Sequence, residues 1–133
     1  VNGEDVFNPS LKKRVGVFRQ YTKSDLNNYH ISYYANAPNK PNRPFSHLRK
    51  NKGFVKVHVG RPGIPSNSKE VHKIQLIKKK NRIVMHLDGE KIIDWKDDGK
   101  SLGPVLGSGK FAFRQMQWTR FRYRNLKIWE LKS

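Results

Sequence analysis

Residues 110–131 read Lys110-Phe-Ala-Phe-Arg-Gln-Met-Gln-Trp-Thr-Arg-Phe-Arg-Tyr-Arg-Asn-Leu-Lys-Ile-Trp-Glu-Leu131. Aromatic side chains take every second position in each half of this stretch, at Phe111, Phe113, Phe121 and Tyr123. A period of two is typical of half-buried β-strands. After Asn125 the apolar residues change parity, which a β-bulge explains without ending the strand. The pattern therefore predicts an antiparallel strand pair that closes the fold.

The same alternation recurs upstream, between segments rich in turn-forming residues. It predicts strands over residues 15–21, 28–35, 53–60, 71–79, 82–87 and 91–95. Asp88-Gly89 joins two of these runs, as is typical of a two-residue hairpin. Connections rich in Pro and Gly are expected at residues 36–44 and 61–68. About eight short strands with no long helix predict an all-β fold, a single antiparallel β-sandwich domain over residues 1–133.

Two predicted strands indicate which side chains share a face. In residues 28–35, one side is expected to carry Tyr29, Ile31 and Tyr33. The other side would then carry Asn28, His30, Ser32 and Tyr34. In residues 53–60, the inward side is expected to carry Val55, Val57 and Val59.

The chain is strongly basic, with 28 Lys and Arg against 10 Asp and Glu and a formal net charge of +18. This charge exceeds what solubility needs and indicates a polyanionic partner. The apolar share is only 35%, so Trp, Tyr and Phe are expected to supply much of a modest core. No apolar run approaches the roughly 20 residues that cross a bilayer, so no membrane partner is expected. The absence of Cys excludes disulfides and thiolate metal sites.

Five segments of the chain resemble a known family. They are residues 28–34, 48–54, 95–99, 103–110 and 113–116. Together they look like the YesU-like family of bacterial proteins, over nearly the whole chain. The resemblance implies a concanavalin A-like jelly roll, a link to polysaccharide-processing gene clusters, and an extracellular or periplasmic setting. It also implies further strands before residue 5, so the chain resembles the C-terminal two thirds of such a protein, and a second chain or copy could complete the sandwich.

The polar side of residues 28–35 is the candidate binding site. We expect it to line a concave sheet together with Arg19, Tyr21, Arg114 and Gln115. Tyr rings stack on sugar faces, and Asn, Gln and Arg form hydrogen bonds with hydroxyl pairs, so this mixture suits a carbohydrate groove. Together with the charge, it predicts binding of an anionic polysaccharide that contains uronates or sulfates. The alternative is that a solvent-facing strand is polar for no functional reason.

Catalysis on the same face is a second hypothesis. A lyase that breaks uronate linkages by β-elimination needs a base, an acid and a group that neutralises the carboxylate. His30, Tyr34 and Arg114 are the candidates for these roles. Glycoside hydrolysis needs a pair of carboxylates, and Glu90 with Asp94, next to a predicted hairpin turn, fits that role less well.

A general polyanion binder, such as a nucleic-acid-binding protein, is the rival hypothesis. Arg120, Arg122 and Arg124 alternate and would form a stripe suited to phosphate or sulfate groups. Further basic groups lie at residues 12–14 and 78–80. The chain has no helix-turn-helix, RNP-like aromatic motif or Cys/His finger, which favours a glycan over nucleic acid.

No cofactor is expected, because the histidines lie on separate segments without the spacing of a metal site. A structural Ca²⁺ at Asp97 or Asp98 is the cation site considered, since sandwich loops can hold hard cations. The alternative for these two residues is an ordinary turn.

Overall fold

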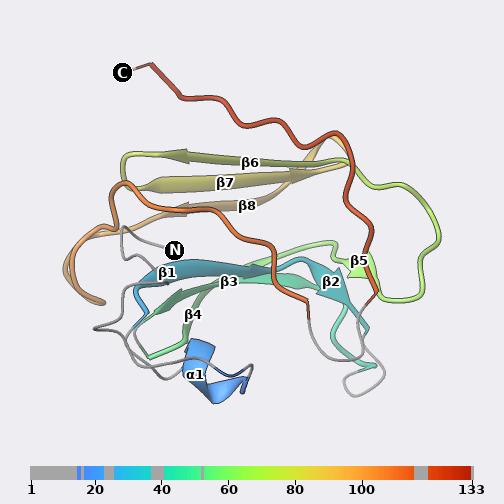
Figure 1. Ribbon diagram of the computed structural model, residues 1–133, viewed down its shortest axis with the longest axis horizontal. Helices are drawn as coiled ribbons and strands as arrows, with labels where there is room; N and C mark the ends of the chain where they lie inside the picture. The colour runs from blue at the N-terminus through green and yellow to red at the C-terminus, as the bar shows by residue number, and fades with distance from the viewer. Residues whose placement is uncertain are drawn as a thin grey trace.

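The computed structural model describes Val15 and residues 17–22, 26–36, 41–51, 53–115 and 120–132, which form the two layers of a β-sandwich (Figure 1). The first sheet has the strand order β1-β3-β4 and contains β1 (Asn28–Ser32), β3 (Ser46–Asn51) and β4 (Val55–Gly60). The second has the order β6-β7-β8 and contains β6 (Ile74–Lys79), β7 (Arg82–Leu87) and β8 (Glu90–Lys96). Two short strands pair in parallel, β2 (Tyr34–Ala35) and β5 (Ile64–Pro65), and α1 (Arg19–Thr22) is a helical turn. The predicted all-β sandwich is confirmed. Among the described residues, no helix has the length and apolarity that a membrane span requires.

The second sheet follows the sequence pattern closely. β7 pairs with β6 on one side and with β8 on the other, antiparallel in both cases. Asp88 and Gly89 form the turn between β7 and β8 and have φ angles of 52° and 89°. A two-residue hairpin of type I′ requires positive φ at both central residues, which Asp-Gly tolerates. The predicted hairpin is therefore confirmed.

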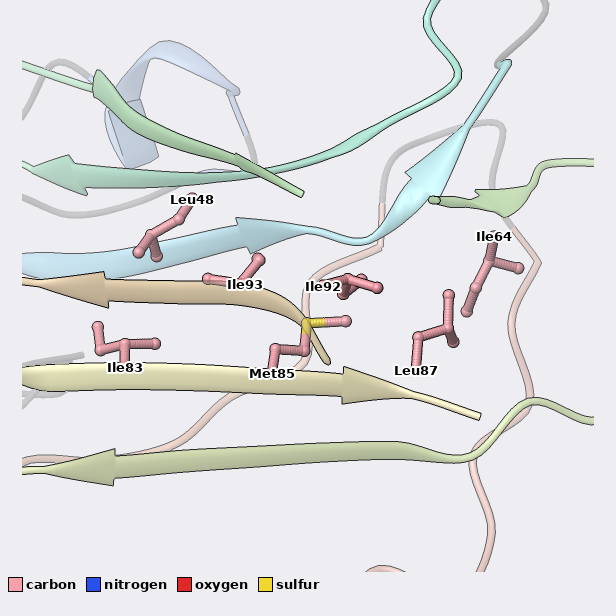
Figure 2. Packing of buried hydrophobic residues seen from close by; sticks show 7 residues of the cluster. All are labelled: Leu48, Ile64, Ile83, Met85, Leu87, Ile92 and Ile93. Carbon is pink, nitrogen blue, oxygen red and sulfur yellow. The ribbon is translucent and has the colours of Figure 1, made fainter. Parts of the chain in front are cut away.

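The hydrophobic core lies between the two layers (Figure 2). Its buried members are Leu48, Ile64, Ile83, Met85, Leu87, Ile92 and Ile93. Tyr29, Ile31 and Tyr33 pack against this cluster, so the face that the alternation predicted they would share is the inward one. The layers approach closely at Gly60, where an added Cβ would lie 2.1 Å from the carbonyl oxygen of Ile92. Glycine is required there because any side chain would force the backbones apart.

A buried polar clamp joins the first sheet to the loops after β8. The Lys50 ammonium lies 2.7 Å from Asp97 Oδ2, and each side chain is only 2% exposed. Lys50 also donates to the carbonyl oxygens of Gly103 and Pro104, at 3.0 and 2.9 Å. The Tyr29 hydroxyl donates to Asp97 Oδ2 at 2.6 Å. Burial raises the pKa of Asp97, but hydrogen bonds from Lys50 and Tyr29 outweigh burial and hold the pKa below its ordinary value.

The predicted closing strand pair is wrong, because residues 110–115 and 120–132 form no strand. Their aromatic rings nevertheless gather: Phe113 stacks on Tyr123 with ring centroids 3.9 Å apart, and Phe121 lies 5.7 Å from Tyr33. Asn125 has a φ of 56°, so the backbone is irregular where the bulge was expected. The alternation identified the apolar side of the segment. A strand also needs a backbone ladder with a neighbour, and these described residues make none.

The strand predicted over residues 15–21 is also wrong, because the chain turns into α1 instead. The Thr22 hydroxyl donates to the Phe18 carbonyl at 3.3 Å, and the Val15 N–H donates to the Gln20 side chain at 2.9 Å. These side chain–backbone hydrogen bonds stabilise a local turn and compete with the ladder hydrogen bonds of an extended strand. The basic group at residues 12–14 and the strands expected before residue 5 lie outside the described residues.

Strand β3 is the middle strand of the first sheet, although Leu48 is its only apolar residue. Its residues are mostly polar, yet five of the six are buried. Its pairing with β4 shifts between Leu48 and Arg49. Val57 packs against the core, whereas Val55 and Val59 are each 39% exposed. The prediction that all three valines face inward is wrong for Val59, which pairs with His47, because the register shift breaks the simple alternation. Val55 pairs with Lys50, whose side chain is buried.

Candidate functional site

The side of the first sheet that faces away from the core carries the candidate site. Ladder pairing places His30 beside Arg49 and Ser32 beside His47. Strand β4 adds Lys56 opposite Arg49. We call this surface the basic face, and its charged and titratable members are His30, Arg43, His47, Arg49, Lys56 and Arg114. Figure 1 shows α1 next to this sheet, on the side away from β6, β7 and β8.

Both histidines of the basic face are neutral at pH 7. Burial lowers the pKa of His30 to about 4, with contributions from the positive charges of Arg114 and Arg49. Burial also lowers the pKa of His47 to about 4, with Arg43 the largest of several cationic contributors. A neutral imidazole offers one hydrogen-bond donor and one acceptor. The positive charge of this face at neutral pH therefore comes from Arg and Lys.

The arginines of the basic face are each held over an aromatic ring. The guanidinium carbon lies 4.9 Å from the ring centroid for Arg43 on Tyr34, 4.4 Å for Arg49 on Phe54, and 4.5 Å for Arg114 on Phe18. Arg43 also donates to the Tyr34 carbonyl at 3.2 Å, and Arg49 donates to the Phe54 carbonyl at 2.7 Å. A stacked guanidinium directs its N–H edge away from the ring, in the geometry that suits a carboxylate or sulfate.

The aromatic rings under these cations contact one another and His30. Phe54 lies 5.4 Å from the His30 ring and 6.0 Å from Phe18, measured between ring centroids. A fourth ring, Phe45, has Lys56 at 5.8 Å and Arg61 at 5.6 Å from its centroid. Cations and rings therefore alternate across this side of the sheet, an arrangement that fixes otherwise flexible cationic side chains.

Buried polar atoms without a hydrogen-bond partner concentrate on the basic face and at Asn28, the first residue of β1. Among the described residues, buried side-chain atoms that find no hydrogen-bond partner include Asn28 Oδ1, His30 Nδ1, Arg43 Nε, His47 Nδ1 and Arg49 Nε. The remaining one is His86 Nδ1, on the other sheet. Folded proteins satisfy most buried polar atoms, so an unsatisfied cluster requires an explanation such as a ligand or ordered water. The fold leaves these particular atoms without a hydrogen-bond partner.

The residues predicted to act with His30 are brought together in part. Asn28 and Ser32 flank His30 on β1. Arg114 lies close enough for its charge to lower the pKa of His30. Tyr34 follows β1 and lies under the Arg43 guanidinium.

The other predicted residues are not brought into this group by the contacts that the structure shows. Arg19 is exposed at the start of α1, and the side chain of Tyr21 lies outside the described part of the structure. Gln115 donates to the carbonyl of Phe121 at 3.1 Å. The stripe residues are exposed but belong to no strand; they are Arg120, Arg122 and Arg124.

Sequence reasoning missed three residues of the basic face that come from β3 and the loop before it. They are Arg43, His47 and Arg49. Arg43 lies in a Pro-rich loop where periodicity carries no signal. His47 and Arg49 alternate with Leu48, which is fully buried. This short alternation of polar and apolar residues was the available signal for a strand with His47 and Arg49 on one side. The polar residues on both sides of it, Ser46, Lys50 and Asn51, hid the pattern because they are buried as well.

The carboxylates considered for catalysis or calcium have partners within the chain. Asp94 pairs with Arg82 at 2.6 Å and Lys91 at 2.9 Å, and hydrogen bonds from these two residues hold its pKa well below the usual range. Asp98 accepts hydrogen bonds from the N–H groups of Lys100 and Ser101 and from the Ser101 hydroxyl. Asp97 belongs to the polar clamp. A calcium ion here would have to displace these partners, and the described residues contain no group of three His, Cys, Asp or Glu side chains arranged to hold a metal.

Comparisons with known proteins agree with this architecture. A family model described as a domain of unknown function (DUF1961) matches residues 1–128. The uncharacterized protein YesU of Bacillus subtilis (strain 168) is 36% identical over 132 residues, which cover 96% of this chain and 60% of YesU. A crystal structure from Bacillus subtilis, of a protein of unknown function with a galectin-like fold, matches with a TM-score of 0.65 and 33% identity, covering 78% of this chain and 49% of that one. The chain thus spans only about half to three fifths of the length of these relatives.

Proposed function

Because the chain belongs to the DUF1961 family and has a galectin-like relative of known structure, we propose that it binds an anionic polysaccharide through the basic face. The observation that carries this proposal is the set of arginines held over aromatic rings beside two neutral histidines. A galectin-like sandwich is compatible with carbohydrate binding, and the positive charge of this chain favours an anionic carbohydrate. No cofactor is needed for such binding, and a polysaccharide partner suits an extracellular or periplasmic setting.

The chemistry of the basic face favours carboxylate or sulfate groups on a sugar. Arg43 and Arg49 each use one N–H group on a backbone carbonyl, which leaves further guanidinium donors for a ligand. Neutral His30, which is partly exposed, can donate to and accept from sugar hydroxyls, whereas His47 is only 4% exposed. A neutral sugar would accept from the guanidiniums only through its hydroxyl oxygens, whereas a uronate or sulfated sugar pairs with them bidentately and with opposite charge.

The net charge supports the same partner. The formal charge of +18 attracts any polyanion, and the carboxylates described above, Asp94, Asp97 and Asp98, already have donor partners. Long-range attraction brings the polymer to the surface, and the fixed arginines then distinguish its anionic groups. Selectivity among glycans of equal charge is therefore the property that separates this proposal from general polyanion binding.

The test replaces Arg43 and Arg49 together by Gln and measures binding to a uronate polymer, a sulfated glycan and a neutral glucan at moderate ionic strength. We expect at least a tenfold loss of affinity for one anionic glycan, because each charge-assisted hydrogen bond contributes about 1.5–3 kcal/mol. The matched control is Lys79→Gln with Lys96→Gln, which removes the same charge from exposed positions of the second sheet. Equal losses in both variants, for every polyanion, would overturn the proposal in favour of nonspecific binding.

A lyase is the second candidate function, favoured by the protonation state of His30. A base that removes the C5 proton of a uronate must be neutral before the reaction, and the low pKa of His30 meets this condition. Arg49 and Arg114 lie close enough to neutralise a uronate carboxylate. Tyr29 and Tyr33 turn toward the core, so Tyr34 stays the candidate acid from β1 and β2.

The proposal also includes a second polypeptide segment or copy beside this chain. Several apolar side chains near its end are largely exposed, with Leu126 at 58%, Ile128 at 74% and Trp129 at 72%. Large exposed apolar groups of this kind are typical of contact surfaces. The relatives have additional length that this chain does not span, which offers one source for such a cover.

A further inference from the structure

A hydrogen-bonded relay of Ser, His and Asp lies away from the basic face. Ser68 Oγ is 2.8 Å from His72 Nε2, and His72 Nδ1 is 2.8 Å from Asp88 Oδ2. Ser68 and His72 come from the loop between β5 and β6, and Asp88 is the first residue of the β7–β8 turn. Figure 1 shows this loop entering β6 at the end of the second sheet where β7 passes into β8.

Backbone hydrogen bonds hold each end of the relay. The Lys73 N–H donates to Asp88 Oδ1 at 2.7 Å, and the Asp88 N–H donates to the Lys73 carbonyl at 2.8 Å. The Ser68 N–H donates to the Pro65 carbonyl at 3.0 Å, and the Glu70 N–H donates to Ser68 Oγ at 3.3 Å. Hydrogen bonds from His72 and Lys73 lower the pKa of Asp88, so it accepts as a carboxylate.

This arrangement sets the tautomer of His72. An Asp carboxylate accepts from Nδ1–H, which leaves Nε2 as the acceptor for the serine hydroxyl proton. The His72 side chain is 18% exposed and that of Asp88 is 49% exposed. Ser68 is half-buried. The geometry is that of a nucleophile, a general base and a residue that orients the base.

We propose that Ser68, His72 and Asp88 form a hydrolytic site for small carboxylic esters. Ser68 Oγ attacks the ester carbonyl carbon while its proton passes to His72 Nε2. The C–O bond to the leaving alcohol breaks, the alcohol takes the proton from His72, and an acyl group stays on Ser68. Water then loses a proton to His72, attacks the acyl carbon and releases the carboxylic acid, and the proton returns to Ser68 Oγ. Asp88 acts as a positioning residue for His72 throughout.

The site is open, which limits the acyl groups that it suits. The loop residues on either side of it are exposed, including Lys69, Glu70 and Lys73. An open site offers no deep acyl pocket, so a short acyl group such as acetyl is the expected substrate class.

The experiment incubates the 133-residue chain with a fluorophosphonate probe, maps the modified peptide by mass spectrometry, and follows hydrolysis of 4-nitrophenyl acetate. We expect modification at Ser68, loss of both signals in Ser68→Ala, and at least a hundredfold slower hydrolysis in Asp88→Asn, where His72 would adopt the wrong tautomer. The matched control is Ser66→Ala, because the Ser66 hydroxyl lies in the same loop but donates to the Asn36 carbonyl at 2.7 Å.

Mapping on the unmodified chain keeps the test independent of how the variants fold. No label on Ser68 in the folded wild-type chain would overturn the proposal. Equal hydrolysis by wild type and a Ser68→Ala variant with unchanged melting would also overturn it. In either case the relay serves only to hold the loop against the β7–β8 turn. Because the relay shares no residue with the basic face, neither result bears on polysaccharide binding.

Discussion

His30 shows how one residue can distinguish a binding protein from an enzyme. It lies outside the core cluster, beside Phe54 and within the electrostatic influence of Arg49 and Arg114. Its neutral ring can bond a sugar hydroxyl or accept a proton, and both roles fit the same position. The two roles differ in which measurable quantity changes when the ring is removed.

Replacing His30 by Ala separates these roles. In a binding protein we expect affinity for the anionic glycan to fall by about 1–3 kcal/mol, the cost of leaving a buried polar partner unsatisfied. In a lyase we expect binding to change little while the absorbance of newly formed unsaturated uronates grows roughly 10²–10⁴ times more slowly. The measurements are calorimetric titration and ultraviolet absorbance on the same glycan. We expect the binding outcome, because sugar contact requires no catalytic assumption.

His86→Ala is the control for this prediction, since His86 is half-buried on the second sheet and also has an unpartnered Nδ1. If His30→Ala lowers the melting temperature and changes neither binding nor turnover, His30 is a packing residue and the functional role is wrong.

The faces of β1 could be predicted from sequence, whereas those of β3 could not. Along β1 an apolar or aromatic residue alternates with a polar one, and this signal is independent of the rest of the fold. Along β3 the buried residues are largely polar, and other parts of the chain supply partners for some of them. Ser46 Oγ donates to the Tyr33 carbonyl at 3.0 Å, and Lys50 bonds Asp97. Such partners are distant in sequence, so a local pattern cannot reveal them.

The C-terminal segment shows the opposite case, in which a clear pattern did not produce the expected element. Its aromatic residues contact one another and Tyr33 without a ladder, and Phe111 and Phe113 stay largely exposed. Periodicity reports the burial preference of side chains, and strand formation also depends on a free neighbouring edge. The prediction of the second sheet succeeded because its hairpins supply their own neighbours.

The polar clamp yields a prediction about how β3 is held to the loops after β8. Asp97→Asn leaves the Lys50 ammonium buried with only carbonyl partners, so we expect the free energy of unfolding to fall by about 3–5 kcal/mol. The control is Asp94→Asn, whose cationic partners Arg82 and Lys91 are 57% and 53% exposed. Exposed pairs contribute at most about 1 kcal/mol. Urea titration at pH 7 measures both, and equal losses would contradict a structural role for the clamp.

The pH dependence of the clamp has a definite sign. The pKa of Asp97 in the folded chain lies below the unfolded value of about 3.9. Its stabilisation is therefore fully present above that pH and is lost as the pH falls through the folded pKa. The Asp97→Asn variant should lose less stability than the wild type between pH 5 and pH 3.

For the molecule as a whole, charge and specificity are separate properties. The net charge of +18 is spread over both sheets and the C-terminal segment, so attraction to polyanions does not depend on one patch. The basic face adds fixed geometry to that attraction. The two contributions respond differently to salt, since attraction of exposed charges is screened while selectivity at a built site persists.

The last prediction tests whether the C-terminal arginines contribute only to nonspecific attraction of polyanions or also to the selective binding site. Arg120, Arg122 and Arg124 are exposed and lie on no strand, so nothing fixes their spacing. Replacing all three by Gln should lower the affinity for every polyanion. It should also flatten the slope of log affinity against log salt concentration, by roughly 0.7–0.9 for each nucleic-acid phosphate that the protein no longer neutralises. Preference among glycans of equal charge should stay unchanged, in contrast to the Arg43 and Arg49 double variant. The measurement is a salt series on a uronate polymer, a sulfated glycan and single-stranded DNA. An unchanged slope would show that these arginines touch no polyanion, and a changed preference would place them in the binding site itself.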